Sequence, residues 1–306
     1  MGRAEAFKAL DRQLKQRNQP TAITSVFGMG GVGKTELAIR YARSRLSTYS
    51  GGVCLAKVRG ADLASQILTF AQVHFGLVPP ETLHDAPTRL DYCWTHWPGQ
   101  GRVLVVVDDL TAWDVLEPCL PRAKRFTILI TTRKTFAGVQ SVPLDVLAPA
   151  DAFALLKSLA GVKRCEEHRI EAEGLCEWLG YLPLALELVG RYLARKPDVL
   201  PKEMRSRLEG KGLTHRATQR EEGRMTAERG VRAALDLSWE ELSQPARELG
   251  CLLSLFALAP IPWETVQRCF PSTDAEELED LRDSGLLNTK IIRAHLDELL
   301  KRKPSV

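Results

Sequence analysis

The stretch GMGGVGKTEL, residues 28–37, decides how this chain can fold, because it places four glycines, a lysine and a threonine within ten positions. Residues 21–27, TAITSVF, form a β-branched run typical of a buried strand, and residues 35–46, TELAIRYARSRL, carry apolar side chains at helical spacing. Glycines without Cβ allow successive backbone N–H groups to converge on phosphate oxygens at the start of a helix. The pattern G-x-x-x-x-G-K-[ST] therefore predicts a phosphate-binding loop.

Within this loop the side chains have separate expected roles. The Lys34 ammonium is expected to reach the β- and γ-phosphates of a nucleotide, and the Thr35 hydroxyl to hold Mg²⁺. The alternative is a glycine-rich turn with a surface lysine, which the flanking strand and helix disfavour. The predicted nucleotide-binding residues of the loop are Gly28, Gly30, Gly31, Val32, Gly33, Lys34, Thr35 and Glu36.

A second motif, RVLVVVDDL at residues 102–110, is an apolar strand that ends in two carboxylates. Such a strand is buried on both faces, and its carboxyl end opens onto the crevice where ligands bind in doubly wound sheets. Asp108 is predicted to bind Mg²⁺ together with Thr35, directly or indirectly. Asp109 is predicted to orient or deprotonate the attacking water. The alternative for both is a helix cap after the strand.

A third apolar strand, FTILITTR at residues 126–133, ends in two threonines and an arginine. Because the strand follows the other two motifs in order, its polar end is expected at the same crevice. Arg133 is predicted to sense or neutralise the γ-phosphate. The alternative is a solvated arginine at a strand end.

Taken in order, GMGGVGKT, VLVVVDD, TILITTR and GYLPLAL resemble the nucleotide-binding core of the NB-ARC group of STAND ATPases. That group includes the apoptosome-forming activating factor, plant disease-resistance proteins and many bacterial signalling proteins. The resemblance covers nearly the whole chain. It implies an α/β P-loop NTPase fold with a doubly wound, mainly parallel sheet, followed by a small all-α helical domain and a winged-helix domain. It also implies ADP or ATP as the ligand, with Mg²⁺.

Further site residues follow from the resemblance. Gly2 and Arg3 match the family's glycine-arginine motif, which lies on the adenine side of the nucleotide. Pro183 matches the proline of the family's GLPLAL motif, here with one residue inserted, and would lie against adenine. Gly180 and Pro183 also suit a helix stop followed by a helix start. His295 corresponds to the histidine that reaches the β-phosphate of ADP, but Ala294 and Leu296 replace the motif's methionine and aspartate.

Two or three domains are expected from the length, because 306 residues exceed the size at which one core usually divides. The motifs and the resemblance favour three. The nucleotide-binding domain is predicted at residues 1–143, a helical domain with a basic linker at 144–225, and the winged-helix domain at 226–306. The helical domain is expected to begin near Leu144, with Asp151 as a helix cap. Residues 191–232 carry 12 Lys and Arg against six Asp and Glu, and are interpreted as an exposed helix or connector.

Nucleotide control is the function that the resemblance implies: ADP in a closed state, ATP in an active state, slow hydrolysis, and domain opening or self-association. The alternatives are a multi-turnover P-loop ATPase and a winged-helix DNA-binding regulator. The basic stretch has no interleaved aromatic residues and no recognition motif, so nucleic acid is not the expected partner. No Asn-Lys-x-Asp sequence is present to read guanine, which favours adenine.

The chain starts at the glycine-arginine motif and stops just past the predicted hairpin of the winged helix. It is therefore expected to be either an excised fragment of a longer protein or a core that acts with separate effector or sensor chains. The composition, 44% hydrophobic and 26% charged, is typical of globular protein. No apolar run approaches the roughly 20 residues that cross a bilayer, so no membrane contact and a cytoplasmic location are expected.

Overall fold

The computed structural model describes residues 3–15, 22–58, 62–214, 225–255 and 268, and the chain divides into two compact units. The sheet unit is Arg3–Asp145, and the helical unit begins at Val146. The predicted boundary at 143/144 lies two residues before this division. The division into three domains stays a prediction, because most of residues 226–306 lie outside the described ranges.

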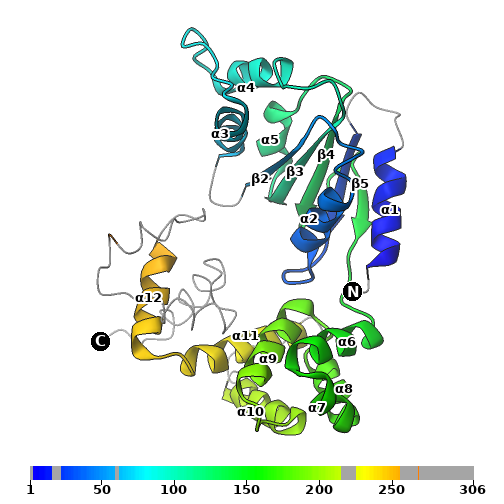
Figure 1. Ribbon diagram of the computed structural model, residues 1–306, viewed down its shortest axis with the longest axis vertical. Coiled ribbons are helices and arrows are strands. Elements are labelled where there is room, and N and C mark those ends of the chain that lie inside the picture. Colours follow the sequence, from blue (N-terminus) through cyan, green and yellow to red (C-terminus); the bar gives the residue numbers. More distant parts are fainter. Residues whose placement is uncertain (1–2, 16–21, 59–61, 215–224, 256–267, 269–306) are drawn as a thin grey trace. The chain divides into compact units, whose positions relative to one another are not determined.

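The sheet unit is built on five parallel strands in the order β2-β3-β4-β1-β5 (Figure 1). The strand bounds are β1 Ala22–Phe27, β2 Val53–Lys57, β3 Val103–Leu110, β4 Phe126–Thr132 and β5 Gln140–Pro143. The three strands predicted from their apolar runs are therefore present. They are adjacent, with β4 between β3 and β1, so their carboxyl ends meet at one edge of the sheet.

Helices cover both faces of this sheet. The helix bounds are α1 Ala4–Lys15, α2 Lys34–Ser44, α3 Leu63–Phe75, α4 Ala86–Thr95, α5 Trp113–Leu116 and the short 3₁₀ helix η1 Glu117–Cys119. Alternate residues of a strand point to opposite faces. Val103, Val105 and Val107 of β3 share a buried cluster with residues of α3 and α4. Asp108 therefore points to the opposite face, where α2 packs on β1, β3 and β4.

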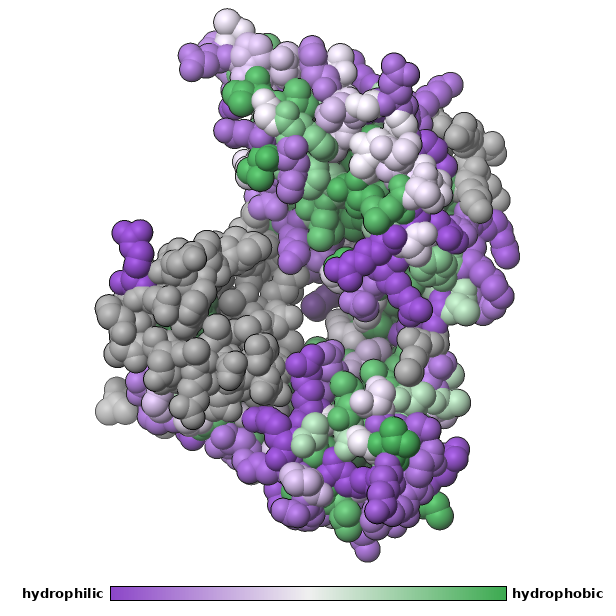
Figure 2. Space-filling model, in the orientation of Figure 1, coloured by the Kyte–Doolittle hydropathy of each residue, from purple (hydrophilic) through white to green (hydrophobic). Residues whose placement is uncertain are grey.

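The Asp11 carboxylate joins α1 to α2 and to Arg45, the residue that follows α2. Asp11 accepts a hydrogen bond of 3.1 Å from the Tyr41 hydroxyl and binds both Nε and Nη2 of Arg45. The Phe7 and Tyr41 rings lie 5.2 Å apart beside this contact. On the face shown in Figure 2, apolar residues gather over the strands of this unit, and hydrophilic residues surround them.

Every described element of the helical unit is a helix. The bounds are α6 Pro149–Ala160, α7 Val162–Glu167, α8 Arg169–Trp178, α9 Pro183–Arg195, α10 Pro201–Thr214, α11 Met225–Glu240 and α12 Gln244–Leu255. The predicted start of α6 was wrong. The helix begins at Pro149 after Ala148, so Asp151 lies inside the first turn and is not the cap. A proline is suited to the first helical position, which explains this start.

The basic stretch is more than a connector. Its residues 201–214 form α10, which packs on α8 and α11 and buries Met204 and Leu208 completely. The corner between α8 and α9 follows the prediction. Gly180 has φ 62° after α8, and Pro183 is the first residue of α9.

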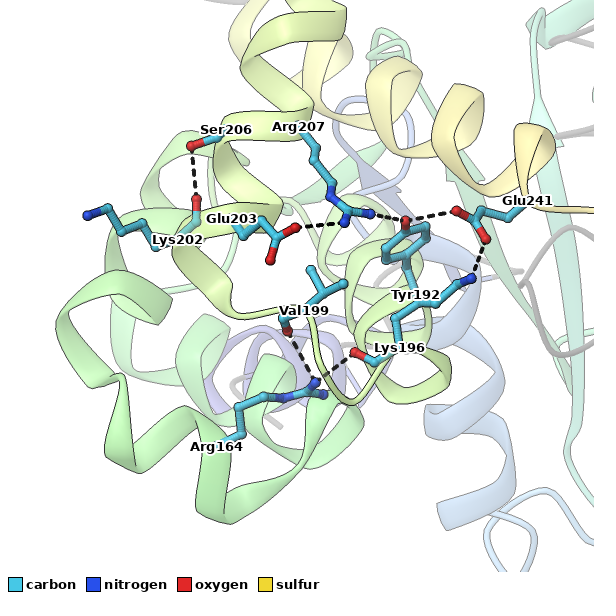
Figure 3. A network of polar contacts seen from close by, with 9 residues as sticks. All are labelled: Arg164, Tyr192, Lys196, Val199, Lys202, Glu203, Ser206, Arg207 and Glu241. Carbon is cyan, nitrogen blue, oxygen red and sulfur yellow. Dashed lines mark hydrogen bonds and ion pairs between the residues drawn. The ribbon is translucent and has the colours of Figure 1, made fainter.

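A polar network joins α9, α10 and the end of α11 (Figure 3). The buried Tyr192 hydroxyl accepts a hydrogen bond of 2.9 Å from Arg207 and donates one of 3.2 Å to Glu241. The Lys196 ammonium lies 2.6 Å from the other carboxylate oxygen of Glu241. The network therefore attaches the residue that follows α11 to α9.

The predicted winged-helix hairpin consists of two short apolar runs, GLLN at residues 285–288 and KIIRAH at residues 290–295, and it lies outside the described residues. Among the helices that the structure describes, none combines the length and the apolar character needed to cross a bilayer.

Candidate functional site

The predicted phosphate-binding loop lies between β1 and α2, and two of its glycines are required by geometry. A Cβ on Gly28 would lie 2.3 Å from the backbone oxygen of Leu144, a distance that real Cβ atoms do not reach. Gly33 has φ 95°, which favours glycine, and its carbonyl accepts the first helical hydrogen bond of α2 from Leu37 at 2.9 Å. The bare backbone thus allows both a close approach and the turn into the helix.

Lys34 occupies the interior of this loop. Its side chain is buried, and its ammonium donates hydrogen bonds of 2.8 Å and 2.7 Å to the carbonyls of Gly28 and Met29. Burial, and then the Arg133 guanidinium, lower the pKa of Lys34, whereas the carboxylates of Asp109 and Asp108 act in the opposite direction. The lysine is therefore in electrostatic contact with the groups predicted at the ends of β3 and β4.

A short hydrogen bond joins the loop to the end of β3. The Thr35 hydroxyl donates to Oδ1 of Asp108 at 2.6 Å, and Asp108 is 2% exposed. The Thr131 hydroxyl, at the end of β4, donates to the same oxygen at 2.6 Å. The structure therefore brings together Thr35 and Asp108, the two predicted Mg²⁺ ligands, and adds a third residue that was not predicted.

Asp109 lies in a β-bulge. Val107 pairs with Ile130 and Leu110 pairs with Thr132, so two residues of β3 stand opposite Thr131 of β4. Asp109 has φ 63°, an unusual conformation for a residue other than glycine, and its amide donates to the Thr131 hydroxyl at 2.9 Å. Asp109 is half-buried and in electrostatic contact with Lys34. The helix-cap alternative is excluded for Asp108 and Asp109, because both lie within β3.

Arg133 follows β4 and lies against the loop. A Cβ on Gly30 would lie 3.3 Å from its Nη2 atom, and the guanidinium influences the pKa of Lys34. Although the arginine is exposed, its head group is beside the loop that would hold phosphates. Its predicted contact with a γ-phosphate stays a prediction.

Arg3 connects the beginning of the sheet unit to the loop and to the end of the unit. Its guanidinium donates to the carbonyl of Val32 at 2.8 Å and to that of Asp145 at 2.6 Å. The side chain of Val32 is itself buried. Arg3 is therefore adjacent to the loop, while its predicted contact with adenine stays a prediction.

The other predicted residues have different outcomes. Gly31, with φ 76°, completes the loop, and Glu36 lies in the first turn of α2. Pro183 begins α9 in the helical unit, and its predicted role stays a prediction. Gly2 and His295 lie outside the described residues.

The residues present fit a magnesium–nucleotide pair. Hydroxyl and carboxylate oxygens are the donors that Mg²⁺ prefers. Thr35 supplies a hydroxyl oxygen and Asp108 a carboxylate oxygen, and these two oxygens lie 2.6 Å apart. Gly28 is held against the Leu144 carbonyl, and Lys34 places a positive charge inside the loop. The arrangement can hold an anionic phosphate chain with its cation.

Comparison with known proteins gives a consistent result. The NB-ARC domain family matches residues 3–166. The chain is 26% identical over 286 residues to the regulatory protein AfsR of Streptomyces coelicolor, an alignment that covers 88% of this chain and 27% of that protein. It is 27% identical over 203 residues to the disease resistance protein RPP8 of Arabidopsis thaliana, covering 60% of this chain and 22% of that protein.

Among solved structures, the chain resembles a signal transduction ATPase with numerous domains, a STAND protein with a tetratricopeptide repeat sensor, from Pyrococcus horikoshii. The TM-score is 0.55 at 19% identity, covering 96% of this chain and 45% of that one. This likeness concerns the fold. The chain spans about a quarter of the length of the curated relatives it matches.

Proposed function

The chain belongs to the NB-ARC domain family of nucleotide-dependent signalling ATPases, and we propose that it acts as an adenine-nucleotide switch with slow ATP hydrolysis. In this proposal ADP holds a closed state, and exchange for ATP permits domain opening and self-association. Effector or sensor chains are the proposed further partners. For any larger protein that contains this sequence, the switch activity is likewise a proposal.

One observation carries the proposal: the contact between the loop threonine and the strand-end aspartate. Thr35 and Asp108 are 73 residues apart in the chain, yet the hydroxyl and the carboxylate lie 2.6 Å apart at the start of α2. When bound, Mg²⁺ would neutralise phosphate charge and orient the phosphate chain. Thr35 and Asp108 would hold it, and Lys34 would supply a fixed positive charge from inside the loop.

Two residues would distinguish the triphosphate from the diphosphate. The Arg133 guanidinium lies beside Gly30 and is exposed, so it can contact an additional phosphoryl group without burying a charge. Asp109 is held by the bulge near Lys34, where its carboxylate can accept a proton from water or orient it. Closure by His295, and base contacts by Gly2, Arg3 and Pro183, are proposed from the resemblance.

The first test identifies the nucleotide carried by the purified full chain. The protein is denatured, and the released small molecules are separated by chromatography and quantified. Stoichiometric ADP is expected, because a closed state would retain it. Absence of nucleotide together with rapid ATP turnover would instead favour a multi-turnover ATPase, and binding of duplex DNA with steep salt dependence would favour a DNA-binding regulator.

The matching variant is Lys34→Ala, with Lys8→Ala as the control. Lys34 makes hydrogen bonds inside the loop, whereas Lys8 lies on α1 with an exposed side chain paired to Glu5. Loss of one charge-assisted contact to phosphate should weaken ADP binding about ten- to a hundredfold, measured by calorimetry. Lys8→Ala should bind like the wild type. Equal affinity of wild type and Lys34→Ala would exclude this loop as the nucleotide site.

A further inference from the structure

The buried threonine at the end of β4 has the geometry of a positioning residue. We propose that the Thr131 hydroxyl sets the orientation of the Asp108 carboxylate for Mg²⁺ and fixes the backbone of Asp109 at the same time. The proposal rests on the proposed function, because it assigns a part to Thr131 in the same phosphate site.

The first step of the argument concerns the β-bulge. A bulge leaves a backbone group without its partner in the strand ladder, and a buried amide without a partner is costly. Here the Asp109 amide donates to the Thr131 hydroxyl at 2.9 Å. The hydroxyl therefore replaces the missing ladder acceptor and holds Asp109 in its φ 63° conformation.

The second step concerns the direction of the hydroxyl proton. A hydroxyl has a single O–H donor, and once it accepts from an amide its proton is free to point elsewhere. The Thr131 proton points to Oδ1 of Asp108 at 2.6 Å. Thr131 is 1% exposed, so water does not compete for this contact. The rotamer of Asp108 is thus tied to the backbone of Asp109.

The third step compares the two threonines. Thr132 is also buried, and its hydroxyl donates to the carbonyl of Leu110 at 2.7 Å, which belongs to the same bulge. Its hydroxyl has no contact with either carboxylate among those that the structure describes. Both residues support the bulged backbone, but only Thr131 touches a predicted Mg²⁺ ligand. Thr132 is therefore a matched control for purely structural effects.

The experiment measures affinity of the full chain for ADP with Mg²⁺ and with a chelator, in three variants. Thr131→Val keeps the shape of the side chain and removes the hydroxyl, Thr131→Ser keeps the hydroxyl, and Thr132→Val is the control. Groups that orient a metal ligand typically contribute 10- to 100-fold in metal affinity. Thr131→Val should therefore reduce the gain in affinity that Mg²⁺ gives by about tenfold or more, with little change in the chelator. Thr131→Ser and Thr132→Val should retain the gain.

A second readout needs no metal or nucleotide. The Asp109 amide should exchange its hydrogen faster in Thr131→Val than in the wild type, and at the wild-type rate in Thr131→Ser. Equal losses of the Mg²⁺ effect in Thr131→Val and Thr132→Val would reduce Thr131 to a structural role and overturn the proposal. An unchanged Mg²⁺ effect in Thr131→Val would also overturn it.

The two proposals can fail separately. If the wild type binds ADP with a Mg²⁺ effect that Thr131→Val preserves, only the role of Thr131 is lost. If the wild type binds no nucleotide and behaves like Lys34→Ala, the switch itself is lost, and with it the role of Thr131 toward Mg²⁺.

Discussion

Individual glycines of the loop are not equivalent, and their surroundings predict different effects of an added methyl group. A Cβ on Gly28 would meet the rigid backbone oxygen of Leu144 at 2.3 Å. A Cβ on Gly30 would meet only the end of the Arg133 side chain, at 3.3 Å. A flexible side chain can move away, whereas a backbone carbonyl next to β5 cannot move without disturbing the strand.

Gly28→Ala should therefore destabilise the protein by about 1–3 kcal/mol, the usual cost of overpacking a tight site. The measurement is urea unfolding of the full chain, with Gly30→Ala as the matched control. Gly30→Ala should change the free energy of unfolding much less, because only the guanidinium is displaced. Equal destabilisation by both substitutions would mean that the close approach to Leu144 is not the deciding contact.

The sequence predicts which residues belong to the site where a short motif contains them. Lys34, Thr35 and Asp108 were found in this way, and the structure brings them together. Thr131 was visible only as one of two threonines at a strand end. Its contact depends on the bulge at Asp109, and the insertion of one residue into a strand leaves no mark in an apolar pattern.

In the helical unit, an ion pair between Lys196 and Glu241 joins the end of α9 to the end of α11. The hydrogen bond from Lys196, opposed by burial, lowers the pKa of Glu241. A carboxyl group whose pKa is lower in the folded state stabilises the fold above its unfolded pKa, near 4.5. This contribution is lost as the pH falls through the folded value.

Glu241→Gln should therefore lower the free energy of unfolding of the helical unit at pH 7. When the pH falls below 4.5, the variant should lose less stability than the wild type. The pair is partly exposed, so the effect should be only about 0.2–1 kcal/mol. The measurement is the midpoint of denaturant unfolding as a function of pH. The control is Glu248→Gln, which removes a carboxylate that accepts only from the neutral amide of Gln244 at 2.9 Å among the described contacts. An identical pH profile for wild type and Glu241→Gln would contradict this assignment.

Elements could be predicted from the sequence where periodicity is strong. The apolar runs gave β1, β3 and β4, and the Gly180–Pro183 corner gave the end of α8 and the start of α9. The basic stretch is interpreted from composition as an exposed helix or connector, and residues 201–214 do form a helix, but composition does not show which of its residues are buried. Met204 and Leu208, one turn apart on the same helix face, are fully buried where α10 packs on α8 and α11.

Across the whole chain, all described groups of the predicted phosphate site lie in the sheet unit, whereas Pro183 and the described helices from α6 to α12 lie in the helical unit. A nucleotide bound only to the sheet unit would affect its own loop and strand ends. A switch requires more, because ADP and ATP must have different free energies of interaction with two states of the chain. The sequence resemblance predicted this coupling, but the periodicity and spacing of the residues do not determine it.

In the proposed switch, Arg133 is the residue expected to register a third phosphoryl group, because its guanidinium lies beside Gly30. Arg133→Gln should bind ADP like the wild type and lose about ten- to a hundredfold of its affinity for a non-hydrolysable ATP analogue, the value of one charge-assisted contact. Lys134→Gln, which removes the neighbouring exposed cation, should leave both affinities unchanged. Calorimetry with each nucleotide measures these values.

Hydrogen exchange on the same full-length variants then tests whether the helical unit responds. In the wild type, both nucleotides should protect residues 28–36, while the exchange of α9 and α11 should differ between ADP and the ATP analogue. In Arg133→Gln that difference should disappear, since the variant cannot register the added phosphoryl group. Protection confined to the sheet unit, and the same with both nucleotides, would mean that the loop binds nucleotide without controlling the rest of the chain.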